Sequence, residues 1–97
     1  MIKVVWSAAA LAQLTAIYEF IAKHSPRYAL RMIDRLTDRS GQIGRFPESG
    51  QIVPEYSDPS LREVIEGSYR LIYRIEPQRI VVVAVIHGAR ILPSDSS

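Results

Sequence analysis

The sequence predicts an α+β fold in which a helical hairpin packs on one face of a mostly antiparallel sheet, in the order β-α-α-β-β-β. Two observations carry this prediction. In the first half of the chain apolar residues recur every three or four positions, and in the second half runs of Val, Ile, Leu and Tyr are separated by two-residue turns. Ninety-seven residues suffice for one two-layer core, so we assign residues 1–97 to a single domain.

The N-terminal segment predicts a short strand followed by a helix. Residues 2–6 are β-prone, and Ser7 is suited to cap a helix that begins at Ala8. The large apolar residues of positions 8–23 fall on one helical face, which predicts that this face packs on a core. They are Leu11, Leu14, Ile17, Tyr18 and Ile21.

A second helix is predicted to begin at Ser25-Pro26, which has the residue types of an N-cap and a first helical position. Its core-facing residues are Ala29, Met32, Ile33, Leu36 and Ile43. Gly41 either ends this helix or only weakens it, since Gln42 and Ile43 continue the period. The short connection predicts an antiparallel pair of helices. Residues 45–60 contain three prolines and a glycine and are expected to be irregular.

The remainder predicts three strands. Residues 61–66 alternate weakly, and Gly67-Ser68 is a two-residue hairpin turn. In the next strand Tyr69, Leu71, Tyr73 and Ile75 share one face, while Arg70 and its alternate neighbours occupy the other. After a turn at Pro77-Gln78, residues 79–87 are apolar on both faces, as is typical of a central strand.

Composition excludes several classes of site. The chain has no cysteine, so disulfides, zinc ribbons, iron–sulfur clusters and thiol nucleophiles are ruled out. The two histidines, His24 and His87, fall in different predicted elements, and we expect neither a metal nor a cofactor. The longest apolar run is too short for a membrane span and no signal peptide is evident, so we expect a cytoplasmic protein without membrane contact. A net charge of +2 is mild and disfavours nucleic acid as the main partner.

The series of residues along the chain resembles the RelE/ParE toxins of type II toxin–antitoxin systems. The first half contributes Trp6-Ser7, Ala12, Leu14, Ile17-Tyr18, Ile21, Ser25-Pro26 and Ala29. The second half contributes Phe46-Pro47, Gly50, Pro54-Glu55, Leu61-Arg62-Glu63, Gly67, Tyr69-Arg70-Leu71-Ile72-Tyr73 and His87-Gly88-Ala89-Arg90. No single motif is decisive, but the combination covers nearly the whole chain in order.

This resemblance implies a small bacterial toxin of a plasmid-stabilisation type of system, neutralised by a cognate antitoxin encoded beside it. The ParE branch is associated with poisoning of DNA gyrase, and the RelE branch with cutting of mRNA on the ribosome. Because the two branches share a fold, the choice between them depends on the site.

An mRNA-cleaving site needs a general base, a general acid and cations that stabilise the phosphorane. The candidates are Arg62, Arg70, His87 and Arg90, with Glu63 and Glu48 as more distant ones. The strand pattern permits Arg62 and Arg70 to share one side of the sheet, where the arginines and His87 would hold a phosphate. In the structural alternative the arginines form ion pairs with Glu63 or Glu66, or cover the sheet with their stems, and His87 is a structural residue.

Compared with RNA-cleaving members of the family, this chain lacks some of the groups for proton transfer. RNA-cleaving members of the family commonly carry an aromatic residue or a His-Tyr pair after the last strand, and lysines that act as base. No Tyr follows His87 here, and the only lysines are Lys3 and Lys23. The resemblance therefore favours a non-enzymatic toxin of the gyrase-directed branch. An mRNA endoribonuclease is the alternative, and an inactive relic that only binds its antitoxin is a third hypothesis.

The expected partner-binding residues lie mainly on the helices. Arg27, Arg31, Arg35 and Arg39 recur every four residues, which predicts a slanting basic band on the second helix. This band is either a solvated face or a docking surface for an acidic antitoxin segment or for gyrase. Leu14 and Tyr18 on the first helix and Arg70 on the sheet complete the set. Exposed apolar helix surface makes a homodimer or a heterotetramer with antitoxin plausible.

Overall fold

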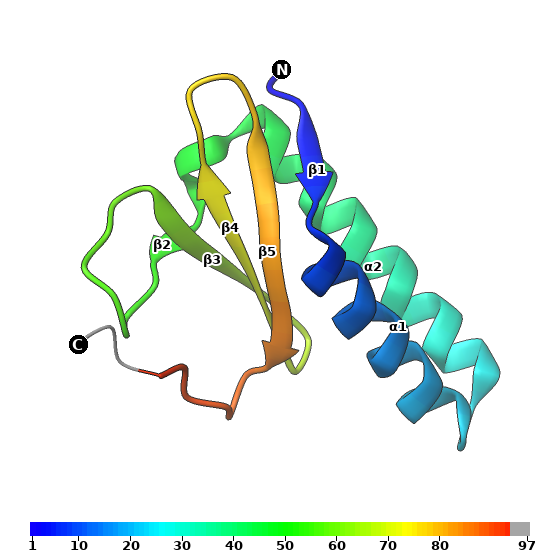
Figure 1. Cartoon of the computed structure of the whole chain (residues 1–97). Helices are drawn as coiled ribbons and strands as arrows, with labels where there is room; N and C mark the ends of the chain where they lie inside the picture. Colours follow the sequence, from blue (N-terminus) through cyan, green and yellow to red (C-terminus); the bar gives the residue numbers. More distant parts are fainter. Residues whose placement is uncertain (94–97) are drawn as a thin grey trace.

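The computed structural model describes residues 1–93 and confirms the predicted α+β architecture. A five-stranded sheet carries two antiparallel helices on one face (Figure 1). The strands are β1 (Val4–Trp6), β2 (Gln51–Ile52), β3 (Leu61–Glu66), β4 (Tyr69–Ile75) and β5 (Ile80–His87). The helices are α1 (Ala8–Ala22), α2 (Pro26–Arg45) and the 3-10 turn η1 (Pro47–Ser49).

The sheet has the order β1-β5-β4-β3-β2 and is antiparallel except for the pair β1–β5. As predicted, β5 is a central strand, since β1 and β4 flank it. The predicted turn also forms: Gly67 has φ 59°, a left-handed conformation that glycine adopts without steric cost, and Glu66 pairs with Tyr69 across it.

Both helices begin where the sequence predicts. The N–H of Ala10 donates to Ser7 Oγ at 3.0 Å, and the N–H of Tyr28 donates to Ser25 Oγ at 3.1 Å. Gly41 does not end the second helix, which continues to Arg45.

Two sequence-based expectations need correction. The segment that we expected to be irregular contains the two-residue strand β2, which pairs with Arg62 and Glu63 of β3. On α1 one member of the predicted stripe is misplaced: Leu14, Ile17 and Ile21 pack against the core, whereas Leu11 is 49% exposed. Ala10, which the stripe did not include, is the one buried residue of this helix.

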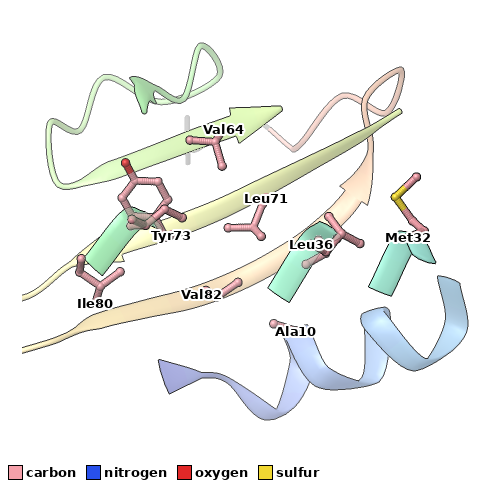
Figure 2. Packing of buried hydrophobic residues seen from close by; sticks show 10 residues of the cluster. Ala10, Met32, Leu36, Val64, Leu71, Tyr73, Ile80 and Val82 are labelled. Atoms are coloured by element: carbon pink, nitrogen blue, oxygen red, sulfur yellow. The ribbon is translucent and has the colours of Figure 1, made fainter. Parts of the chain in front are cut away.

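The main core lies between the helices and the sheet (Figure 2). Met32 and Leu36 of α2 face Val64, Leu71 and other strand residues, and Ala10 marks the close approach of α1 (Figure 2). The full buried cluster is Ala10, Met32, Leu36, Ile43, Val64, Leu71, Tyr73, Ile80, Val82 and Val85.

A second, smaller cluster lies on the opposite face of the sheet. Its buried residues are Val53, Leu61, Ile72 and Ile86. Ile72 alternates with Leu71 and Tyr73 along β4, so it points away from the helices. We call this side the outer face; residues 53–60 and 91–93 lie along it (Figure 1). Neither helix of residues 1–93 is both long and apolar enough to cross a bilayer.

Candidate functional site

Arg70 is the most constrained candidate residue of the chain. It lies in β4 on the outer face and is only 6% exposed. Its Nε donates to Glu63 Oε1 at 2.6 Å, and its Nη1 and Nη2 donate to the two carboxylate oxygens of Glu55, each at 2.7 Å. Such a forked guanidinium–carboxylate pair is the strongest geometry available to arginine. The guanidinium is therefore occupied by two carboxylates from its own chain.

The charges of this cluster are strongly coupled. Hydrogen bonds from Arg70, with a further one from the backbone N–H of Leu92, lower the pKa of Glu55 to about 2. The hydrogen bonds to Glu55 and Glu63 raise the pKa of Arg70 above its usual value. One guanidinium and two carboxylates leave the cluster with a net charge of −1 near neutral pH. We call these three residues the Arg70 cluster.

The Arg70 cluster also fastens the C-terminal segment to the loop after β2. Arg70 Nη1 donates to the carbonyl of Arg90 at 3.0 Å, and the N–H of Leu92 donates to Glu55 Oε2 at 2.9 Å. Beside them, the hydroxyl of Tyr56 donates to the carbonyl of Pro93 at 2.8 Å. Arg70, Glu55 and Tyr56 thus hold residues 90–93 against the outer face.

A cleft of about 350 Å³ lies next to this segment on the outer face. Its floor is apolar and its rim carries Tyr56 and the ion pair of Arg74 with Asp58, at 3.6 Å. The apolar lining residues are Leu61, Ile72, Val83, Ala84 and Leu92.

Arg62 does not lie beside Arg70. It pairs directly with Tyr73, whose side chain belongs to the core on the helical side, whereas Arg70 pairs with Ile65 on the outer face. The two guanidinia are therefore on opposite faces of the sheet. The expectation that Arg62 and Arg70 share one side of the sheet is wrong. The Arg62 side chain donates to the carbonyls of Pro59 and Gly50, each at 3.0 Å, and so holds the irregular segment against β3.

His87 and Arg90 are both exposed and line a groove beside α1. The ring of Tyr69 meets the His87 ring edge-on, with centroids 5.9 Å apart. The N–H of Ala89 donates to His87 Nδ1 at 3.1 Å. Of the four cleavage candidates, His87 and Arg90 line the same groove, and Arg70 contacts the backbone carbonyl of Arg90 from the outer face. Arg62 lies on the other face of the sheet, so the four side chains do not surround one site.

The predicted basic band on α2 divides into two parts. Arg27 and Arg31 are exposed. Arg35 instead donates twice to Glu66 of β3, with distances of 3.0 and 2.8 Å, and Arg39 donates to Gln42 at 3.1 Å. The buried Nε of Arg39 has no hydrogen-bond partner within residues 1–93. The open part of the band is therefore its N-terminal half.

On α1, Leu14 is half-buried and packs against the core, and Tyr18 is also half-buried. The more open apolar side chains of this helix are Leu11 and Phe20. Partner binding by Leu14 and Tyr18 would therefore use only part of each side chain.

The ion pair of Arg70 with Glu63 is one that the structural alternative named, whereas the contact of Arg70 with Glu55 was not predicted. Across a two-residue turn, residues of opposite number parity share a face, so Glu63 and Arg70 could have been placed on one side from the pattern alone. Glu55 carried no such signal, because it lies in a segment without periodicity. Among residues 1–93, no three histidine, aspartate or glutamate side chains are grouped to hold a metal ion.

Comparison with known proteins connects this chain to toxins. The family described as the ParE toxin of the type II toxin–antitoxin system parDE matches residues 4–92. The chain is 35% identical over 92 residues to Toxin RelE2 of Caulobacter vibrioides, which covers 94% of this chain and 100% of the relative.

Solved structures share the fold at lower identity. The chromosomal ParDE system of P. aeruginosa gives a TM-score of 0.73 at 19% identity and covers 90% of this chain and 96% of the other. The RelBE2 toxin–antitoxin complex of Mycobacterium tuberculosis gives 0.60 at 22% identity, covering 92% and 93%. The YoeB/ParE toxin of Agrobacterium tumefaciens gives 0.59 at 21% identity, covering 88% and 96%.

Proposed function

Because the chain belongs to the ParE toxin family of type II toxin–antitoxin systems, we propose that it acts by binding DNA gyrase and that a cognate antitoxin neutralises it in the cytoplasm. This is a non-enzymatic mode of action: the toxin holds its target in an unproductive state and breaks no bond itself.

The Arg70 cluster is the observation that carries the proposal. A scissile phosphate can reach the Arg70 guanidinium only by displacing Glu55 or Glu63, and its negative charge would then face two carboxylates. Glu63 is 4% exposed, so its charge cannot be relieved by turning into water. The arginine best placed on the outer face thus serves the fold and is not available to stabilise a phosphorane.

The remaining candidate groups support the same conclusion. Arg62 is committed to backbone carbonyls. His87 and Arg90 lie at the α1 groove, and no lysine or carboxylate lines that groove among the described residues. Among the described residues that line this groove, the groups able to transfer a proton are His87 and Tyr69, whose rings contact each other edge-on.

An mRNA endoribonuclease is the second candidate, because the relative at 35% identity is named Toxin RelE2. In that reading Arg62, Arg70, His87 and Arg90 would act on mRNA bound to the ribosome, and binding there would have to rearrange the Arg70 cluster.

Inhibition of purified DNA gyrase tests the first proposal. Relaxed plasmid, ATP and gyrase are incubated with increasing toxin, and supercoiled product or cleaved DNA is followed on gels. We expect supercoiling to be blocked or cleaved DNA to accumulate, and addition of the antitoxin before the toxin to prevent this. Unchanged gyrase activity at saturating, folded toxin would contradict the proposal.

A further inference from the structure

A β-bulge in β5 shapes the outer face of the sheet. The register between β4 and β5 shifts at Ile72 and Tyr73, which leaves Val83 as an extra residue of β5. Val83 and Ala84 are consecutive, yet both pack against the smaller cluster on the outer face, where a regular strand would point one of them to the helices. The cleft of about 350 Å³ lies over these two side chains, and the small Ala84 leaves room in its floor.

Ile91 protrudes beside this cleft. Its side chain is 81% exposed, whereas the next residue, Leu92, lines the cleft. The carbonyl of Arg90 accepts a hydrogen bond from Arg70. The N–H of Leu92 donates to Glu55, so the backbone is held on both sides of Ile91. The chain therefore presents an aliphatic side chain at a fixed position next to an apolar hollow.

The rim of the cleft carries one cation and one anion that are only loosely paired. Arg74 Nη1 and Asp58 Oδ2 are 3.6 Å apart, beyond hydrogen-bond distance, and both side chains are nearly half exposed. Asp58 Oδ1 instead accepts the N–H and the hydroxyl of Ser60, at 2.9 and 2.7 Å. Each charge of the rim is therefore open to a closer partner of opposite sign.

We propose that two copies of this chain associate through their outer faces as a symmetric dimer, in which Ile91 of each copy enters the cleft of the other. The rim charges are exchanged at the same time, so that Arg74 of each copy pairs with Asp58 of the other. A two-fold interface brings the same surface of both subunits together, so an axis between Ile91 and the cleft produces both insertions at once. A second copy is the occupant because this chain supplies what the cleft lacks: an exposed aliphatic side chain and a complementary pair of charges.

The proposed dimer leaves the helical side of each copy open. Helices α1 and α2 lie on the other side of the sheet from the cleft (Figure 1). The contact consists of one cleft and one inserted side chain per copy, which makes it a small interface. We therefore expect weak association, with a Kd between about 1 and 100 µM.

Analytical ultracentrifugation of the full-length toxin tests the association. The protein is examined from about 1 to about 300 µM, a range that brackets the expected Kd. We expect a monomer at the lowest concentration and an average mass that rises towards that of a dimer. A folded toxin that stays monomeric over the whole range overturns the proposal.

Two matched substitutions locate the interface. Ile91→Asp removes the inserted side chain and should weaken the dimer by about tenfold or more. Leu30→Asp is the control, because Leu30 is 57% exposed but lies on α2, and it should change the Kd by less than about twofold. Circular dichroism checks that both variants are folded. Equal losses for the two variants, or a dimer broken by Leu30→Asp alone, would place the contact elsewhere and overturn the proposal.

A mixing experiment tests the exchanged charges. Arg74→Asp puts two acidic groups opposite each other across the two-fold axis, and Asp58→Arg puts two basic groups there, so each variant alone should dimerise at least about threefold more weakly. In a mixed dimer of the two variants every acidic group faces an arginine, so an equimolar mixture should regain association. Folded variants whose mixture associates no better than either variant alone would contradict the exchanged pairs.

Discussion

Arg70 Nε lies 2.6 Å from a carboxylate oxygen of Glu63 on the neighbouring strand, and both side chains are almost fully buried. The two residues are diagonal neighbours on the outer face, since Arg70 pairs directly with Ile65. Glu55 closes the other side of the guanidinium from the loop after β2. Each charge of this cluster depends on its partners, because removing one leaves another in a place that water reaches poorly.

Replacing Arg70 should therefore be costly for folding. In Arg70→Ala the buried Glu63 carboxylate loses its charged partner, and we expect the free energy of unfolding to fall by roughly 3–5 kcal/mol. Urea denaturation at pH 7 measures this. Arg79→Ala serves as the control, because Arg79 forms an exposed pair with Glu76 and should change stability only slightly. Equal effects of the two substitutions would show that the Arg70 cluster does not support the fold.

The lowered pKa of Glu55 predicts an acid-sensitive contribution to stability. Its folded-state pKa of about 2 lies below the ordinary value of 4.5, so the charged form favours the folded state. This contribution is present above pH 4.5 and is lost as the pH falls towards 2. Thermal unfolding of the wild type and of Glu55→Gln should therefore differ most at pH 5 to 7 and converge between pH 4 and 2. A difference that grows with acidification would contradict this assignment.

Two glycines should respond to alanine in opposite directions. A Cβ at Gly50 would lie 2.6 Å from both the carbonyl oxygen of Glu63 and the hydroxyl of Tyr73, so the backbone would have to move. We expect Gly50→Ala to cost about 1–3 kcal/mol, as overpacked sites do. At Gly41 a Cβ meets nothing within 4 Å, and Gly41→Ala should stabilise α2 by about 0.5–1 kcal/mol.

The midpoints of denaturant unfolding of Gly50→Ala and Gly41→Ala, compared with the wild type, measure these two stability changes. Loss of stability at Gly41, or none at Gly50, would mean that α2 or the β2–β3 contact differs from the structure described.

Much of the fold follows from the sequence, because both helix caps and the hairpin turn act locally. Ser7, Ser25 and Gly67 each fix a boundary through contacts with their own neighbours. The strand β2 was not predictable, since two residues carry no periodicity and their pairing with Arg62 and Glu63 is set by the tertiary fold. Leu11 was misplaced because α1 is apolar around most of its circumference, so its pattern does not single out one buried face.

The site was predictable only in part. The sequence singles out several arginines as candidate site residues, but the role of each depends on what surrounds it. Across the two-residue turn at Gly67-Ser68, residues on the two strands whose numbers are both even lie on opposite faces of the sheet. The strand pattern alone therefore places Arg62 and Arg70 on opposite faces. The contact of Glu55 with Arg70 joins an irregular segment to a strand, and only the folded chain reveals it.

The open half of the basic band on α2 gives a prediction about association with the antitoxin. Arg27 and Arg31 are exposed, whereas Arg35 already pairs with Glu66. If an acidic segment approaches this face, Arg27→Glu with Arg31→Glu should lower the association rate several-fold at low salt. The effect should shrink towards 0.5 M NaCl, where charges are screened within about 5 Å. Stopped-flow mixing measures the association rate. If the rate depends neither on these two charges nor on salt, this face of α2 does not contact the antitoxin.

The most direct test of the central claim compares DNA topology and mRNA integrity in the same cells after induction of the toxin. Plasmid supercoiling is read on chloroquine gels and transcript ends by primer extension. We expect plasmids to lose negative supercoiling while transcripts stay intact, and we expect co-expression of the antitoxin to restore normal supercoiling. Transcripts cut within codons while plasmid supercoiling stays normal would contradict it.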